Sequence, residues 1–89
     1  MVEPKVECKS DDKKLGNFGN LWECANACQE IGDCKYFIYG TGGKKGECFW
    51  EKTEGADCPE GWDEDDKYDF YEIISKLNSH KLIEFLVYN

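Results

Sequence analysis

Apolar and polar positions follow a helical period between Asn20 and Gly32. Asn20 is a suitable N-cap, and Glu23, three residues later, can supply the second arm of a capping box. Gly32 suits the position that follows the last helical residue. The apolar side chains recur three and four positions apart, at Leu21, Cys24, Ala25, Cys28 and Ile31. The pattern therefore predicts one amphipathic helix that turns Cys24 and Cys28 towards the core.

The next part of the chain predicts a β-hairpin. Lys35–Gly40 and Glu47–Glu51 are rich in aromatic or other strand-forming residues, and a glycine-rich loop of about six residues joins them. Side chains alternate along a strand, so Cys48 and Trp50 share one face and Phe49 lies on the other. We therefore expect Trp50 to belong to the core.

The remaining segments are less regular. Val6–Lys9 is expected to form a short first strand, followed by a polar loop at 10–14. Thr53–Lys67 is acidic and is expected to be irregular, whereas Tyr68–Ile74 alternates loosely and predicts a last strand. The order strand, helix, hairpin, strand predicts an α+β fold in which one helix packs on a short antiparallel sheet.

The C-terminal tail at 75–89 permits two interpretations. Its apolar side chains fit a helical stripe, which is the interpretation we favour, but Ile83–Tyr88 also fits a β segment. So many apolar groups are unusual on a solvated chain end. We expect the tail to dock on the domain or on a partner through Leu82, Ile83, Phe85, Leu86 and Tyr88.

Six cysteines change the expected source of stability. A single domain of 89 residues has a small core, so cross-links matter. An even number of irregularly spaced cysteines predicts disulfides made in an oxidising compartment, which leaves the pairing open. The sequence has no Cys-x2-Cys pair and one histidine, His80, which disfavours a zinc site or a thioredoxin-like redox site.

The cysteine spacing resembles the PAN/Apple domain family. The matching pattern is Cys24-x3-Cys28-x5-Cys34, then Phe37 on the first hairpin strand and Cys48-Phe49 on the second. The resemblance covers residues 5–74, and 20–52 carries most of its specificity. It implies a small disulfide-rich α+β domain with disulfides Cys24–Cys48 and Cys28–Cys34, and the remaining bridge would join Cys8 to Cys58.

One feature departs from the Apple pattern. In that pattern the last cysteine follows the final strand and ties the two termini together. Cys58 instead precedes the expected last strand, Tyr68–Ile74. The third bridge is therefore the one that the resemblance supports least.

Charge and hydropathy narrow the classes of partner. The net charge is −8, with acidic residues concentrated between Glu51 and Glu72, which disfavours a nucleic-acid partner. No stretch has the length and apolar character of a membrane span. The first residues lack the apolar core of a signal peptide, so we expect a mature or excised segment of a secreted protein, with an organelle lumen as the alternative.

The resemblance implies a non-catalytic module that binds protein or carbohydrate. No cofactor is expected, and an enzyme is disfavoured because no cysteine remains as a nucleophile if all six pair. Aromatic rings dominate many binding sites, so the candidate ligand-binding residues are Trp22, Trp62, Tyr36 and Tyr39. No metal site is expected beyond weak calcium binding by Asp63, Asp65 and Asp66.

A second interpretation belongs to a different functional class. The chain would then be a small structural accessory subunit that its apolar tail locks into a larger assembly. The position of residues 82–88 discriminates between the two. A tail that folds back onto the domain favours the free-standing module, and a tail that reaches a partner favours the subunit.

Overall fold

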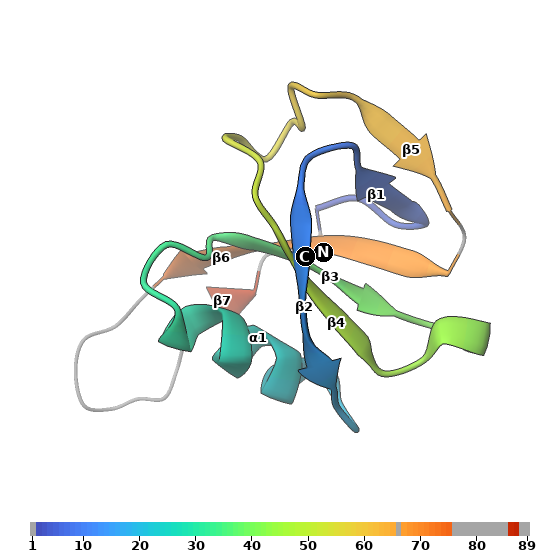
Figure 1. Cartoon of the computed structure of the whole chain (residues 1–89), viewed down its shortest axis with the longest axis vertical. Coiled ribbons are helices and arrows are strands. Elements are labelled where there is room, and N and C mark those ends of the chain that lie inside the picture. The colour runs from blue at the N-terminus through green and yellow to red at the C-terminus, as the bar shows by residue number, and fades with distance from the viewer. Residues whose placement is uncertain (1, 66, 76–85, 88–89) are drawn as a thin grey trace.

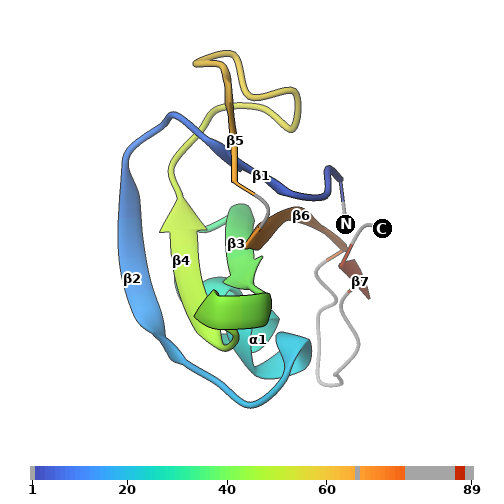
Figure 2. The same cartoon turned by 90° about the vertical axis from the view of Figure 1, so that its right-hand side faces the viewer.

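A five-stranded antiparallel sheet forms the centre of the structure (Figure 1). The computed structural model describes residues 2–65, 67–75 and 86–87 of the chain. The strand order is β2-β4-β3-β6-β7, and Figure 2 shows these strands side by side. Their bounds are β2 Asp12–Asn17, β4 Glu47–Glu51, β3 Tyr36–Gly40, β6 Tyr68–Ser75 and β7 Leu86–Val87. A separate antiparallel pair contains β1 Val6–Cys8 and β5 Trp62–Glu64.

The hairpin of β3 and β4 has the predicted register. Phe37 lies opposite Trp50, and Tyr39 lies opposite Cys48. The connection contains a short 3-10 helix, η1 Gly42–Lys44. Gly40 is required at the start of this turn, because a Cβ atom there would collide with the backbone carbonyl of Lys44.

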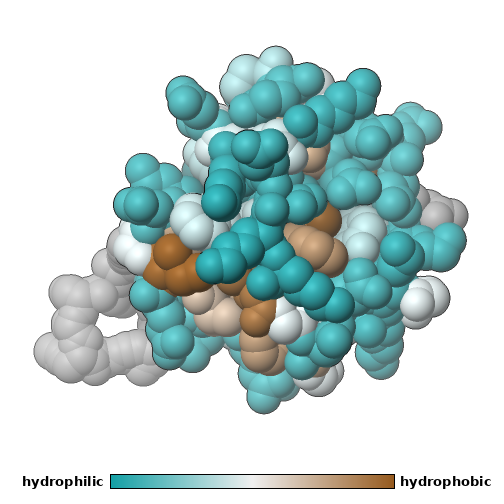
Figure 3. Space-filling model, in the orientation of Figure 1, coloured by the Kyte–Doolittle hydropathy of each residue, from teal (hydrophilic) through white to brown (hydrophobic). Residues whose placement is uncertain are grey.

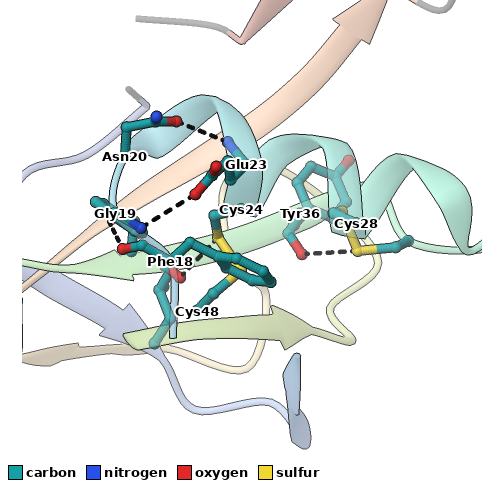
Figure 4. The surroundings of a disulfide bond; sticks show 11 residues. Phe18, Gly19, Asn20, Glu23, Cys24, Cys28, Tyr36 and Cys48 are labelled. Atoms are coloured by element: carbon teal, nitrogen blue, oxygen red, sulfur yellow. Dashed lines mark hydrogen bonds between the residues drawn. A yellow bond between two sulfur atoms is a disulfide. The ribbon is translucent and has the colours of Figure 1, made fainter. Parts of the chain in front are cut away.

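The helix α1 Leu21–Glu30 forms as predicted and packs on β2, β3 and β4. The side chain of Asn20 accepts a hydrogen bond from the Glu23 backbone N–H at 3.0 Å (Figure 4). The Glu23 carboxylate accepts from the N–H of Gly19 at 3.1 Å, one residue before the expected partner. Gly32 follows the C-cap residue Ile31, whose N–H donates to the Cys28 carbonyl at 3.0 Å.

Both faces of the main sheet are covered. The helix-side core lies between α1 and one face, and contains Cys24, Ala25, Cys28, Cys34, Phe37, Tyr39 and Cys48. The second core lies on the opposite face, beneath β1 and β5, and contains Cys8, Tyr36, Ile38, Cys58, Tyr68 and Phe70. The fold is therefore α+β, as the sequence predicts, but it has three layers rather than two.

Three disulfides connect these layers. Cys24–Cys48 joins α1 to β4, and Cys28–Cys34 joins the end of α1 to the segment before β3. Cys8–Cys58 joins β1 to the connection between β4 and β5. These are the three pairs expected from the family resemblance. Cys58 pairs with Cys8 as expected, although it precedes the last strand of the PAN-like region instead of following it.

Two expectations for local structure are wrong. The polar segment 10–14 is not all loop, because β2 begins at Asp12 and pairs with β4 along the sheet edge. The acidic segment Thr53–Lys67 contains β5, which pairs with β1. Both strands are largely exposed, so neither carries the alternating apolar pattern of a half-buried strand.

The tail is a strand where it is described. Leu86 and Val87 form β7, paired with β6 through Ile73↔Val87 and Ser75↔Leu86. The favoured helix is therefore wrong at these two residues, because their backbone groups complete hydrogen bonds along the edge of β6. Ser75 ends β6, and the other tail residues, at 76–85 and 88–89, lie outside the described residues. They include Leu82, Ile83, Phe85, Tyr88 and His80.

Candidate functional site

A surface depression lies where β3 begins and β4 ends, and we refer to it as the hairpin hollow. Aromatic, hydroxyl and charged side chains come together in this small area. Two lysines and two acidic residues of the lining are exposed, so their hydrogen-bonding groups are available to a ligand. The lining residues are Asp33, Lys35, Tyr36, Trp50, Glu51, Lys52, Thr53 and Glu54.

Trp50 supplies the main aromatic surface of the hairpin hollow. Its side chain is half-buried and packs against the helix-side core, which fixes its position. The Nζ atom of Lys52 lies 4.7 Å from the centroid of the Trp50 ring, within cation–π range. The expectation of Trp50 on the helix side is correct, but part of the ring remains accessible.

Tyr36 contributes less surface to the hollow. Its side chain is 9% exposed, and its ring stacks on Phe70 with centroids 5.8 Å apart. Burial is the main cause that raises the pKa of Tyr36, and the negative charges of Glu72 and Asp57 act in the same direction. The phenol therefore stays neutral at physiological pH and can serve as a hydrogen-bonding group.

The other predicted ligand-binding residues lie elsewhere. Trp22 is on α1 and is 55% exposed. Trp62 is half-buried on β5, with its ring edge-on to Phe70 at a centroid distance of 5.0 Å. Tyr39 is 9% exposed and its hydroxyl donates to the Phe18 carbonyl at 2.8 Å, so little of its side chain is available to a ligand.

The structure does not gather the four predicted aromatics into one site. Tyr36 and Trp62 both contact Phe70 in the second core, whereas Trp22 and Tyr39 lie on the helix side. Figure 3 shows a mainly hydrophilic surface in its view, with hydrophobic residues in small groups. The hairpin hollow combines the partly accessible ring of Trp50 with several polar groups. A second hollow, on the outer side of α1, places the half-buried ring of Phe18 beside polar side chains of the helix.

The predicted calcium residues do not form a cluster in the described part of the chain. Asp63 is exposed on β5, and Asp65 accepts a hydrogen bond from the backbone N–H of Lys67 at 3.0 Å. Asp66 lies outside the described residues. The metal-capable groups among described residues lie elsewhere, at Glu7, Asp12 and Glu51 and at Cys8, Cys58 and Glu60.

The second of these groups is chemically unsuited to a metal. Cys8 and Cys58 form a disulfide, so neither sulfur is available as a thiolate ligand. Glu60 is then a single carboxylate, and it accepts a hydrogen bond from the hydroxyl of Thr53. Sequence reasoning missed the first group because its members are far apart in the chain and meet only through β1, β2 and β4.

Comparison with known proteins gives one match. A family model described as the PAN domain matches residues 3–75. No curated protein and no solved structure matches this chain. PAN domains are disulfide-stapled modules known for interactions with proteins and carbohydrates, and they are generally non-catalytic. No helix among the described residues has the length and apolar character needed to cross a membrane.

Proposed function

Because this chain belongs to the PAN domain family, we propose that it is a non-catalytic binding module whose hairpin hollow takes a carbohydrate ligand. The observation that carries the proposal is the meeting of the accessible Trp50 ring with polar side chains in one small depression. An aromatic face can stack on a sugar ring while neighbouring polar groups bind its hydroxyls. The three disulfides support an extracellular or other oxidising location.

The size of the hollow favours a sugar over a protein partner. A stable protein interface buries about 800 Å² on each side and is usually anchored by several aromatic or arginine side chains. Among the described residues, Trp22 is the only large hydrophobic side chain that counts as exposed, at 55%. A few sugar units need far less area, so the hairpin hollow suits them better.

The position of β7 supports a free-standing module over a subunit held by its tail. Leu86 and Val87 pair with β6 of the same chain, so this part of the tail returns to the domain. The accessory-subunit interpretation requires residues 82–88 to reach a partner instead.

A glycan array probed with the complete, oxidised chain tests the proposal. We expect binding to a defined set of glycans, followed by at least a tenfold loss of affinity in Trp50→Ala, because the stacking surface is removed. Trp22→Ala is the matched control, since it removes a tryptophan outside the hollow. Its affinity should stay within twofold of the wild-type value.

A second pair of variants separates binding from folding, because Trp50 also packs against the core. Lys35→Ala changes an exposed lysine of the hollow, and Lys45→Ala changes an exposed lysine outside it. Only the first should weaken glycan binding, with unchanged thermal unfolding in both. The proposal is wrong if no glycan binds, or if Lys35→Ala and correctly folded Trp50→Ala both bind as the wild type does.

A further inference from the structure

Three carboxylates from different strands meet beside the hairpin hollow. Glu7 lies on β1, Asp12 begins β2 and Glu51 ends β4. One oxygen of each carboxylate lies within 4.8 Å of the corresponding oxygens of the other two. Asp12 and Glu51 are direct partners in the antiparallel register of β2 and β4, so the sheet itself fixes their separation.

The burial of Glu51 gives a second, independent indication of a ligand. Its side chain is completely buried. Its Oε1 atom accepts a hydrogen bond from the Ser10 hydroxyl at 2.9 Å, whereas its buried Oε2 atom has no partner among the described residues. An unsatisfied buried carboxylate oxygen is strongly destabilising, so a protein seldom retains one without a compensating group.

The negative charges around this cluster are a further reason to expect a compensating group. Burial and the negative charges of Asp65, Asp12 and Asp63 all raise the pKa of Glu7. Glu7 and Asp12 in turn place their negative charges beside Glu51. A bound cation would neutralise the repulsion among the three carboxylates and would offer a partner to the Oε2 atom of Glu51.

We propose that Glu7, Asp12 and Glu51 bind a calcium ion. The donor set consists of carboxylate oxygens without nitrogen or thiolate, which suits a hard cation. Oxygens that surround one calcium ion at about 2.4 Å lie at most about 4.8 Å apart, and the oxygens of this cluster lie within that limit of one another. Water molecules would complete the coordination shell, because calcium takes about six to eight oxygen ligands.

The ion would add a link between β1 and the edge of the main sheet formed by β2 and β4. β1 belongs to the small β1–β5 pair, whereas β2 and β4 belong to the main sheet. The Cys8–Cys58 disulfide holds β1 to the β4–β5 connection but does not reach β2. Calcium at the carboxylate cluster would therefore fix β1 against the edge of the main sheet.

Isothermal titration of chelator-treated, full-length protein with CaCl2 tests this site directly. We expect one calcium ion per chain with a dissociation constant of about 10⁻⁴ to 10⁻³ M, the range of extracellular calcium modules. The thermal midpoint should rise in CaCl2 by several degrees more than in NaCl of equal ionic strength. The NaCl comparison is needed because screening alone stabilises a chain with net charge −8.

Two variants identify the ligands. Glu51→Gln and Asp12→Asn should each weaken calcium binding at least tenfold, and Asp12 is exposed, so its variant is expected to fold. Glu30→Gln, which removes one exposed carboxylate at the far end of α1, is the matched control and should bind calcium as the wild type does. No glycan is present, so the result is independent of the proposed function.

Several outcomes would overturn the proposal. Equal thermal shifts in CaCl2 and ionic-strength-matched NaCl would show screening only. Equal affinity for calcium in Glu51→Gln and Glu30→Gln would place the ion elsewhere. Magnesium binding as tight as calcium binding would contradict the choice of ion, because the smaller cation requires oxygens closer together at about 2.0 to 2.1 Å from its centre.

Discussion

Glu51 is a fully buried residue whose side chain would carry a negative charge if it were ionised. Burial raises the pKa of its carboxyl group from 4.5 to about 8, with further increases from Asp12 and Glu7. The hydrogen bond from the Ser10 hydroxyl acts in the opposite direction but is outweighed. In the absence of a cation, the folded protein therefore keeps this group protonated at neutral pH.

This raised pKa predicts a pH dependence of stability in the presence of a chelator. Between pH 4.5 and about 8 the unfolded chain ionises Glu51 while the folded chain holds its proton. The stabilisation present below pH 4.5 is thus lost progressively as pH rises towards 8, with a limiting slope of about 1.4 kcal/mol per pH unit. Urea unfolding from pH 5 to 9 measures this change.

Glu51→Gln provides the reference for the pH experiment, because its side chain has a similar shape and does not titrate. The free energy of unfolding of the wild type, minus that of the variant, should fall with rising pH and become level above about pH 8. Subtraction removes the contributions of the other acidic residues that titrate alike in both proteins. A difference that stays constant across this range contradicts the predicted pKa.

The sequence predicts which face of a strand a side chain occupies, but it does not predict how deeply that side chain is buried. Alternation along β4 correctly places Cys48 and Trp50 on the helix side. The alternation does not show how much of the Trp50 side chain the helix-side core covers. Trp50 remains partly accessible in the hairpin hollow. The sequence likewise gives no sign that the Tyr39 side chain is buried, with its hydroxyl bonded to the carbonyl of Phe18.

At the scale of elements, the strands and helix with a strong internal pattern are the predictable ones. α1 has capping residues and a helical period, while β3, β4 and β6 are rich in aromatic or β-branched residues. β2 begins with Asp-Lys-Lys and is held by pairing with β4, a contact between distant segments. Its lysines suit an exposed edge strand, yet the same residues in isolation favour a loop.

The N-cap of α1 gives a prediction at this scale. Asn20→Ala removes the side-chain acceptor of the Glu23 backbone N–H, so the free energy of unfolding should fall by about 1 kcal/mol. Asn26→Ala is the matched control, because it makes the same change at an exposed position inside the same helix. Chemical denaturation should show equal or greater stability for the control; a loss as large as that of Asn20→Ala would assign the effect to side-chain loss in general.

At the scale of the whole molecule, disulfides link layers that enclose only small cores. The main sheet separates two small cores, and each core contains at least one complete disulfide. The carboxylate cluster lies where β1 approaches the main sheet, and its residues Glu7, Asp12 and Glu51 share no local motif. Such a cluster is invisible in the sequence, because only the assembled layers bring the three strands together.

The disulfides should contribute unequally, according to the length of chain that each one closes. Cys8–Cys58 spans a sequence separation of 50, whereas Cys28–Cys34 spans 6. In the chain-entropy model the longer loop restricts the unfolded state more, by about 4 kcal/mol against roughly 2 kcal/mol. Replacing both cysteines of one bridge by serine should therefore destabilise the protein more for Cys8 and Cys58.

The two double variants are well matched, because each converts two buried cysteines into buried serines. The cost of burying the new hydroxyl groups is similar in both and largely cancels in the comparison. Urea unfolding should give a free-energy difference of roughly 2 kcal/mol between them. An equal loss, or a larger loss for Cys28 and Cys34, would show that native-state contacts around each bridge outweigh the restriction of the unfolded chain.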